Sequence, residues 1–511
     1  MERSFSLLPN EKARLVNYVL TLRSLMIIVF VTIASISIKK LYRKNAKHAA
    51  KSVLSWRMFH PLGYAVEYGT DWRKFVDKYS SVYGSVFRCR IAMKSFTFVN
   101  DHRLLTKMMQ KNNVFRFDLI FMDLKEKVFQ LSSPFDLHPR FHSAAVKYLS
   151  GDKLERLSER YVFFFQQIMS ASYNTGTWLE INGKTFIDHL VFAGSSRAAI
   201  GDFDDNIISS DLKRHFDNFD NNIHLISAGI PECFLSSIRE SQTYVTNYLA
   251  TLPEEKESEF MEVVDWVCEN MDVYRPKLLF LMLWAVNANS QPAIFWTLMF
   301  LLRDPHAMEL LKEEAETVVK EETGWVADTN AGTTLPPLPA SALMKMKGVH
   351  SYILDCIRIQ SSYMALRQMS RDHLVELKTG EKFQFYKGDI IMGCNQHHRS
   401  DIFPEPMTPK VDRFIRNGNL FRDEFGNLVS SANLSFGMGK DLCPGKQFFL
   451  HEATCVVATL LLAYDVELKA PETPVPPPNM TRVGLGCMSL HPSYENDASV
   501  WIRIKRKSEV L

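Results

Sequence analysis

The sequence predicts a mainly α-helical protein with small β-sheets and one N-terminal membrane anchor helix. Three observations lead to this fold class. Residues 104–280 follow a mostly helical pattern, residues 445–464 form a long apolar segment of helix length, and the alternating, strand-like segments are short. The chain has 511 residues, of which 46% are hydrophobic and 23% charged. This ordinary globular composition excludes disorder or coiled-coil repetition as the main structure.

Charge and cysteine content narrow the class of protein. The 60 Lys+Arg nearly balance the 57 Asp+Glu, giving a formal charge of +3. Without a concentrated basic face we expect no nucleic-acid partner. The eight cysteines are too sparse for a disulfide scaffold and lack the spacing of a structural zinc site. Reduced thiols in a cytosolic domain are therefore the simplest interpretation.

The N-terminal region predicts a membrane anchor. An uncharged run at 24–38 reaches spanning length when it is extended back to Tyr18. Basic residues follow the run, which favours a cytosolic position for the rest of the chain. They are Lys39, Lys40, Arg43, Lys44, Lys47 and Lys51. A cleaved signal peptide is the alternative, although the immediate pair of lysines favours an anchor. We expect residues 1–51 to be the anchor with its basic flank, and residues 52–511 to form one large domain.

The remaining elements follow in chain order. Apolar periodicity and turn residues predict short strands, amphipathic helices and proline-rich loops between them. The expected strands lie at 82–100, at 375–392 around a turn at 379–381, and at 500–504, the helices at 308–323, 344–361 and 445–464, and the loops at 329–340, 403–436 and 471–478.

The most specific segment is 436–445, which reads FGMGKDLCPG. Its glycines let the backbone turn tightly and approach a flat ligand. Cys443 lies just before the predicted helix, and Pro444 suits the first helical position. The helix dipole and free N–H groups would stabilise a thiolate there, and Phe436 would shield the sulfur from water. A thiolate is a strong axial ligand for haem iron. A buried structural cysteine is the alternative interpretation.

The spacing F-x-x-G-x-x-x-C-x-G resembles the haem-binding loop of the cytochrome P450 family, and the resemblance covers essentially the whole chain. It implies the cytochrome P450 fold, with residues 52–511 as the haem-thiolate catalytic domain and heme b (iron protoporphyrin IX) as the cofactor. Cys443 is then the axial ligand of the haem iron. Phe436, Gly439 and Gly445 are implied to contact the cofactor.

Two further features concern the haem carboxylates. Most family members carry Arg or His where this chain has Asp441, and an acid cannot neutralise a propionate. Arg367 falls where the family places a propionate-binding arginine, although a surface arginine is the alternative. Other basic residues near the expected site leave the second partner open. They are His138, Arg140, His142, Lys147 and Lys440.

A buried charge network is also implied by the resemblance. Family members carry Glu-x-x-Arg on a helix before the cysteine, and here Asp355 and Arg358 stand three residues apart, so they can meet on one helix face. Arg413 matches the partner from the later loop. We expect this structural core to fix the loop that presents the thiolate. Alone, D-x-x-R is a weak signal, since most such pairs lie on the surface.

The central segment 278–302 is uncharged and long enough to span a membrane. Polar residues at its centre argue instead for a helix in the core of a globule. Pro292 lacks an N–H, so the carbonyl of Ala288 loses its helical partner and a groove opens beside Asn289 and Ser290. The resemblance implies that these two residues take the catalytic positions of the family's acid and threonine. A kinked core helix without chemistry is the alternative.

The central segment resembles one branch of the family, which holds cholesterol 7-alpha-hydroxylase, oxysterol and sterol 12-alpha-hydroxylases, and prostacyclin synthase. The resemblance implies a monooxygenase of the endoplasmic reticulum membrane, with a cytosolic catalytic domain, that hydroxylates a sterol or other lipid. It would use O2 and electrons from NADPH-cytochrome P450 reductase, docking near Lys440, Lys446 and Arg416. The alternatives are an isomerase of a lipid endoperoxide or hydroperoxide and a non-catalytic haem-binding membrane protein.

Overall fold

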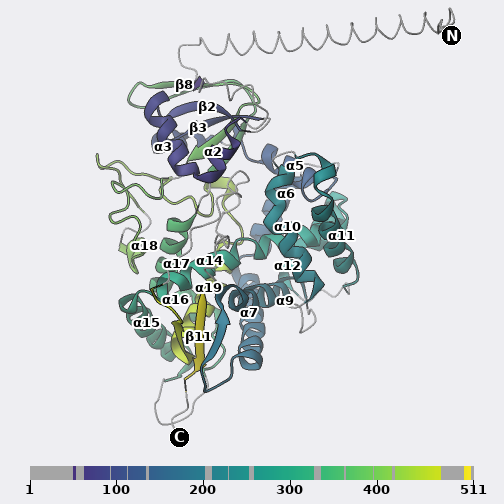
Figure 1. Ribbon diagram of the computed structural model, residues 1–511, viewed down its shortest axis with the longest axis vertical. Coiled ribbons are helices and arrows are strands. Elements are labelled where there is room, and N and C mark those ends of the chain that lie inside the picture. The colour runs from purple at the N-terminus through teal and green to yellow at the C-terminus, as the bar shows by residue number, and fades with distance from the viewer. Residues whose placement is uncertain are drawn as a thin grey trace, which may run out of the picture.

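The structure is a computed structural model of the chain, and its described residues carry the fold that the sequence predicts: mainly helices with small sheets (Figure 1). The described ranges are 50–52, 63–91, 94–111, 113–133, 137–201, 210–227, 230–252, 258–326, 335–361, 364–394, 396–416, 420–472 and 500–507. The expected anchor at 18–38 lies outside these ranges, as does the proline-rich loop beyond residue 472.

The largest sheet has six strands in the order β1-β2-β3-β9-β6-β4 and lies near the top of Figure 1, with α2 and α3 beside it. β2 and β3 form the antiparallel hairpin expected at 82–100, pairing Val86 with Val99. Phe87 and Phe98 stack with their ring centroids 5.0 Å apart, so the hairpin buries an aromatic core. The elements are β1 (Lys51–Ser52), α2 (Ala65–Thr70), α3 (Trp72–Tyr83), β2 (Val86–Ile91), β3 (Lys94–Val99), β4 (Phe115–Arg116), β6 (Met364–Met369) and β9 (Ile390–Cys394).

Two smaller sheets complete the β structure. β7 (His373–Glu376) and β8 (Lys382–Phe385) form the hairpin expected around residue 380, whose φ of +85° favours glycine. At the opposite end of the molecule, β11 (Trp501–Arg506) pairs with β10 (Tyr464–Leu468) and β5 (Leu179–Asn182). The expectation of a mostly helical segment at 104–280 is confirmed, with β4 and β5 as short strands within it. The short strand β5 is stabilised by pairing with β11, more than 300 residues away in the sequence. Local periodicity cannot predict such a distant partner.

The helical body surrounds three central helices: α14 (Ser290–Leu301), α17 (Lys347–Gln360) and α19 (Lys446–Ala463). The others are α4 (His102–Gln110), α5 (Asp118–Lys127), α6 (Leu137–Tyr148), α7 (Gly151–Ser172), α8 (Gly183–Ile187), a π-helical turn (Asp188–Ala193), α9 (Gly194–Ile200), α10 (Asp211–Ser227), α11 (Ser236–Ala250), α12 (Glu259–Met271), α13 (Arg275–Asn287), α15 (Pro305–Thr323), α16 (Ala340–Lys345) and α18 (Arg413–Arg416), with short 3-10 turns at Glu232–Phe234 and Gly439–Asp441.

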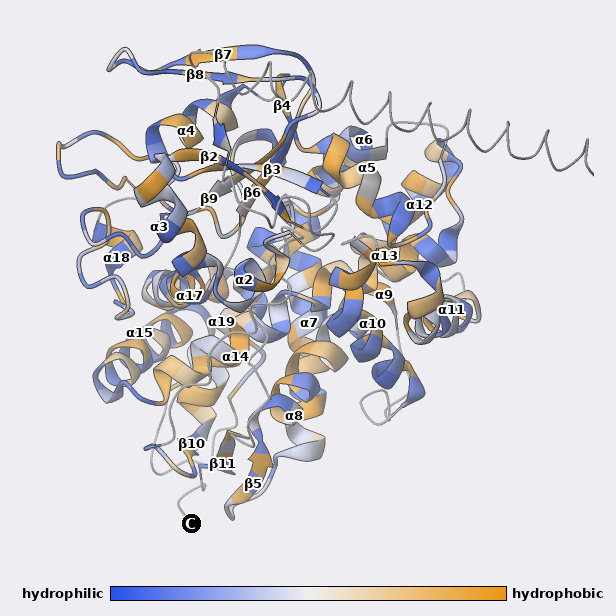
Figure 2. Cartoon of the chain, turned by 45° about the horizontal axis from the view of Figure 1, so that its top comes forward, coloured by the Kyte–Doolittle hydropathy of each residue, from blue (hydrophilic) through white to orange (hydrophobic). Residues whose placement is uncertain are grey.

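The most apolar helices lie inside the protein. Figure 2 shows α13 and α14 largely in the hydrophobic colour. Among the described residues, two stretches are long and apolar enough to cross a membrane: Arg275–Leu301, 89% buried over its most apolar window, and Lys446–Ala463, 83% buried. A helix that is apolar on all sides and buried in protein belongs to a globular core. The site described next is built on these buried helices.

Candidate active site

The loop at 434–445 closes on itself around Cys443. Gly437 and Gly439 have φ values of +77° and +69°, a region that strongly favours glycine. A Cβ on Gly437 would lie only 2.8 Å from the carbonyl oxygen of Asp441, so the close approach also requires glycine. The Cys443 N–H donates to the Phe436 carbonyl at 2.8 Å. The backbone alone therefore sets where the cysteine points.

The Cys443 side chain is exposed, yet it lies deep enough that burial raises the pKa of its thiol. The residue as a whole is exposed, while its thiol lies among enough protein atoms to be desolvated. Backbone N–H groups of Gly445 and Lys446 and the charge of Lys446 oppose this rise in pKa. For the free thiol, burial raises the pKa more than the N–H groups at the start of the helix lower it. A metal ion bound to the sulfur would instead remove the proton completely.

The helix after the cysteine begins later than the sequence predicted. α19 starts at Lys446 and Gly445 is its N-cap, so the expectation of Pro444 at the first helical position is wrong. A Cβ on Gly445 would sit 3.9 Å from the Cys443 sulfur, which leaves the glycine beside the thiol without crowding. Phe436 is half-buried against α19, with its ring centroid 5.7 Å from that of Phe449.

The structure brings Asp355, Arg358 and Arg413 together in the interior. The Asp355 Oδ1 accepts from Arg358 Nε at 2.6 Å, and its Oδ2 accepts from Arg413 Nε at 2.7 Å. The backbone N–H of Lys410 also donates to Asp355 Oδ2, at 2.9 Å. Asp355 and Arg358 are fully buried. The shorter aspartate therefore reaches both arginines, and both of its oxygens are bonded.

A residue that the sequence did not single out connects this network to the cysteine loop. The His397 carbonyl accepts a hydrogen bond from Arg358, and the His397 Nε2 accepts from the N–H of Leu434 at 3.0 Å. This geometry requires the neutral ring with its proton on Nδ1. Burial and nearby Arg358 hold the pKa of His397 well below 6.5, in agreement with that tautomer. No local sequence signal marks His397, because both contacts are long-range.

The central helix is interrupted where the sequence predicted a weak point. α13 ends at Asn287 and α14 begins at Ser290, so the expected single kinked helix is two helices. Asn289 stands between them with a buried Oδ1 that has no hydrogen-bond partner in the described part of the chain. Ser290 is buried as well. An unsatisfied buried acceptor beside a broken helix marks a place suited to a polar ligand atom.

Arg367 lies on β6, an unpredicted strand, and is 1% exposed, so the surface-arginine interpretation is wrong. Its Nη2 lies 3.2 Å from Asp441 Oδ2, and its Nη1 donates to the Leu366 carbonyl at 2.7 Å. The Nε and Nη2 of Arg367 have no hydrogen-bond acceptor among the described residues. Two buried donors without acceptors fit a carboxylate ligand.

The other basic candidates separate into near and distant groups. His138 is buried, and the charge of Asp441 acts on it, although burial is the larger effect and lowers the pKa of His138. His142 Nε2 lies 2.8 Å from the carbonyl oxygen of Leu442, the residue before the cysteine. Arg140, Lys147 and Lys440 are exposed. The two histidines therefore lie near the cysteine loop, and exposed Lys440 belongs to the loop itself.

These residues fit the cofactor that the sequence resemblance implies. Among the described residues no group of three His, Cys, Asp or Glu side chains could hold a metal ion. A porphyrin would supply four nitrogen ligands to an iron bound at Cys443. The accessible sulfur, the tight glycine turns and the unsatisfied donors of Arg367 match the thiolate, the flat ring and the carboxylates of haem.

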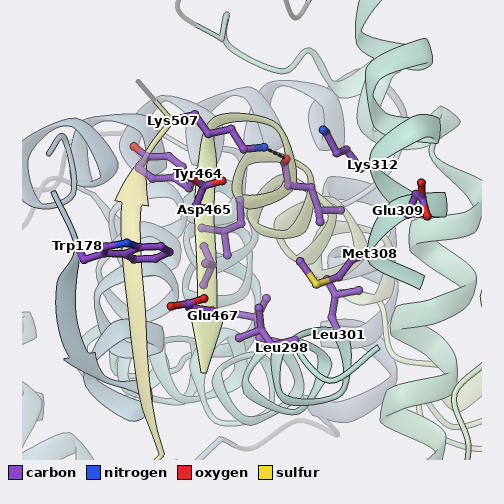
Figure 3. Close-up of a pocket in the computed structure, with 14 residues that line it drawn as sticks. Trp178, Leu298, Leu301, Met308, Glu309, Lys312, Tyr464, Asp465, Glu467 and Lys507 are labelled. Atoms are coloured by element: carbon purple, nitrogen blue, oxygen red, sulfur yellow. Dashed lines mark hydrogen bonds between the residues drawn. The ribbon is translucent and has the colours of Figure 1, made fainter. Parts of the chain in front are cut away.

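A separate cavity of about 530 Å³ lies away from this site (Figure 3). Leu298 and Leu301 of α14 line it, together with Tyr464 and Lys507. Leu298 is eight residues beyond Ser290, which corresponds to about 12 Å along a helix. Lys507 donates to the Leu461 carbonyl at 2.6 Å and so caps the end of α19. The cavity is thus built on the far ends of the two helices whose beginnings carry the candidate site.

Comparisons with known proteins agree with the geometry. The cytochrome P450 family profile matches residues 277–495. Among curated relatives, the 5-beta-cholestane-3-alpha,7-alpha-diol 12-alpha-hydroxylase of Sus scrofa is 27% identical, covering 85% of this chain and 89% of the relative. The 7-alpha-hydroxycholest-4-en-3-one 12-alpha-hydroxylase of Homo sapiens is 26% identical with the same coverage. Prostacyclin synthase of Rattus norvegicus is 23% identical, covering 84% and 89%. Residues 277–495 therefore match the cytochrome P450 family, and the relatives named above are similar to this chain over about 85% of its length.

Proposed function

We propose that this chain is a membrane-anchored haem-thiolate monooxygenase that hydroxylates a sterol or a related lipid. The observation that carries the proposal is the accessible sulfur of Cys443, presented by a self-closing loop at the start of a buried helix. The printed names of the similar hydroxylases, which refer to cholestane and cholestene derivatives, support the sterol class. The larger identity to these hydroxylases than to prostacyclin synthase favours hydroxylation over isomerisation.

On the cofactor side of the site, different residues have different roles in binding the haem. Bound haem supplies the iron at which O2 is activated. Cys443 ligates that iron, and the N–H groups of Gly445 and Lys446 tune the electron donation of its sulfur. Arg367 binds a haem carboxylate, while Phe436 and Gly439 shape the surface beside the ring. Asp355, Arg358 and Arg413 fix the segment that leads into the loop.

Asn289 and Ser290 act on the substrate side. The break between α13 and α14 leaves the buried Asn289 Oδ1 available to orient water or a substrate oxygen. The amide cannot donate a proton as an acid would, so the hydroxyl of Ser290 is the group that holds and passes a proton. The apolar sides of α13 and α14 exclude bulk water from this exchange.

Membrane attachment and electron supply complete the proposal. Residues 1–51 anchor the chain in the endoplasmic reticulum membrane, and residues 52–511 form the cytosolic catalytic domain. NADPH-cytochrome P450 reductase supplies electrons at the face carrying Lys440, Lys446 and Arg416. Lys440 and Arg416 are exposed there, whereas Lys446 is half-buried with its Nζ 5.7 Å from the Phe436 ring.

The first experiment tests the thiolate. The purified holoprotein, reduced under carbon monoxide, is expected to show a Soret band far to the red of that of a His-ligated haem, and Cys443→Ser should abolish this band. Cys455→Ser is the matched control, because Cys455 is buried in the same helix region but lies away from the loop. A wild-type spectrum typical of His ligation would overturn the proposal.

The second experiment separates the reactions. With reductase and NADPH, cholestane and cholestene sterols should be hydroxylated with one oxygen atom from O2. Ser290→Ala should lower product per NADPH by about tenfold or more, whereas Ser290→Thr should keep it, because the hydroxyl remains. Turnover of a lipid endoperoxide without reductant, and no sterol product with it, would instead establish an isomerase. Thiolate spectra without either turnover would indicate a haem-binding protein.

A further inference from the structure

Beside the cysteine loop, Arg367 of β6 and Asp441 of the turn Gly439–Asp441 form a buried ion pair. Their side chains are 1% and 4% exposed, and the Nη2–Oδ2 distance is 3.2 Å. The sequence contains 73 residues between these two positions, so only the fold brings them together. Asp441 is the position at which this chain departs from the basic residue that its family resemblance implies.

The pair is electrostatically matched but poorly hydrogen-bonded. Nη2 and Oδ2 are close, yet neither they nor the Arg367 Nε satisfy hydrogen-bond geometry with any described residue. The single bond of the guanidinium is that of Nη1 to the Leu366 carbonyl, within the described part of the chain. Unsatisfied buried donors are costly, and a planar guanidinium pairs best with a carboxylate that takes two donors at once. Arg367 is thus only half engaged by Asp441.

Arg367 is the buried cation of this neighbourhood, although the charge of exposed Lys440 also reaches His138 and Asp118. The guanidinium carbon of Arg367 lies 5.4 Å from the Phe117 ring centroid, which covers one side without neutralising an anion. His138 is buried nearby, and burial keeps its pKa below 6.5, so it is mainly neutral at pH 7. Asp118 adds a second carboxylate to this neighbourhood, although Arg116 pairs with it. A carboxylate arriving here therefore depends on Arg367.

We propose that Asp441 competes with the haem carboxylate for Arg367, and that this competition loosens haem and lowers its reduction potential relative to a neutral residue. The inference rests on the proposed function, because it assigns Arg367 to the cofactor. Two carboxylates that share one buried cation repel each other, so each is held less tightly than it would be alone. A fixed negative charge near the iron also favours the ferric state.

A charge series at position 441 tests the competition in the full-length holoprotein. Asp441→Asn should slow haem transfer to excess apomyoglobin by about tenfold, because an engaged charged hydrogen bond contributes this order of free energy. Asp441→Lys should slow the transfer further, and both variants should shift the reduction potential to more positive values. Asp441→Glu retains the negative charge and should therefore keep the wild-type rate of haem transfer and the wild-type reduction potential. Asp412→Asn is the control, because Asp412 pairs with the exposed Arg416.

Repeating the Asp441→Asn substitution in Arg367→Gln protein tests whether its effect on haem acts through Arg367. If the competition acts through Arg367, the benefit of Asp441→Asn should shrink strongly in Arg367→Gln protein, giving a coupling between the two positions. An Asn variant that retains the thiolate band but releases haem as fast as wild type, or faster, overturns this inference alone. Equal effects of Asp441→Asn with and without Arg367 also overturn it. A wild-type protein that lacks the thiolate band overturns the proposed function first.

Discussion

Two buried charge networks support the same loop, and they differ in how completely their carboxylates are hydrogen-bonded. The arginines differ less, because Arg358 Nη2, like Arg367 Nε and Nη2, has no acceptor within the described residues. Asp355 accepts three bonds on two oxygens, and Arg413 also donates to the carbonyls of Pro404, Glu405 and Thr408. Asp441 instead lies beside Arg367 with its Oδ2 unbonded within the described residues. Both networks are almost fully excluded from water.

The difference separates a structural network from a binding network. A fully bonded buried carboxylate has no capacity for a ligand and fixes the backbone segments that it joins. Among the described residues, Arg367 has two unused buried donors, Nε and Nη2, and its carboxylate partner is itself unbonded at Oδ2, whereas Arg358 has one unused donor beside a fully bonded carboxylate. Unused buried donors are costly unless a ligand supplies acceptors. We therefore expect substitutions in the first network to reduce the stability of the fold, and substitutions in the second to act mainly on cofactor binding.

The largest expected effect is on the first network. Asp355→Ala leaves Arg358 and Arg413 buried without their carboxylate, which should lower the free energy of unfolding by about 3–5 kcal/mol. Urea unfolding of the solubilised protein measures the change. Asp412→Ala is the control and should cost well below 1 kcal/mol, because its ion pair with Arg416 is exposed. Equal losses in the two variants would show that the buried first network contributes no more to stability than an exposed ion pair.

A third buried acid, Glu452, sharpens the comparison because no cation among the described residues shifts its pKa. Glu452 is 1% exposed and accepts from the Ser195 hydroxyl at 2.6 Å, and burial raises its pKa to about 8. The folded protein therefore keeps the proton that the unfolded chain releases near pH 4.5. This contribution to stability is complete at low pH and is lost as the pH rises from 4.5 through 8.

Glu452→Gln should remove that pH dependence. Because glutamine carries no titrating proton, the variant is expected to be more stable than wild type by about 4 kcal/mol at pH 8 and similar to wild type at pH 4.5. Urea unfolding at a series of pH values measures both. A parallel decline of wild type and variant between pH 5 and 8 would show that Glu452 is ionised in the fold.

The next expected effect concerns the connection between the first network and the cysteine loop. His397→Ala removes the acceptor for the Leu434 N–H and should cost about 1–3 kcal/mol. Since burial lowers the pKa of His397, its contribution is present above about pH 6.5 and is lost as the pH falls. The variant should also lose part of the thiolate Soret band, which a remote destabilising substitution such as Leu311→Ala should leave intact.

The local parts of this architecture could be predicted from the sequence. The spacing of Asp355 and Arg358 on one helix turn, the missing N–H of Pro292 and the glycines at 437 and 439 each act within a few residues. Their structural consequences follow from backbone geometry alone. The resemblance to the family added Arg413, which no local pattern connects to Asp355.

The long-range parts could not be predicted. His397 meets Leu434 across 37 residues, and Asp441 meets Arg367 through strand β6, which the sequence did not predict. In the sequence, Glu452 is only one acidic residue in an apolar helix. Its raised pKa depends on neighbours that only the fold brings close. The helix start was misplaced by two residues, because the turn at Pro444 and Gly445 is set by the loop rather than by helix propensity.

The smallest expected effect on stability is also the sharpest test of the comparison. Replacing both Arg367 and Asp441 by apolar residues of similar volume, as Arg367→Met with Asp441→Leu, removes a buried pair together with its unsatisfied donors. Such replacements are often neutral or stabilising, so the apoprotein should unfold within about 1 kcal/mol of wild type. Its affinity for haem should nevertheless fall, because the carboxylate partner is gone. Haem titration followed by absorbance, beside urea unfolding, measures both quantities.

The corresponding double substitution in the first network, Asp355→Leu with Arg358→Met, should behave differently. It leaves Arg413 without its carboxylate and the His397 carbonyl without the Arg358 donor, so the apoprotein should be destabilised by several kcal/mol despite the conserved volume. If both doubles unfold alike, hydrogen-bond saturation does not distinguish the two networks. If only the second network tolerates apolar replacement, its charges are retained for the cofactor and not for the fold.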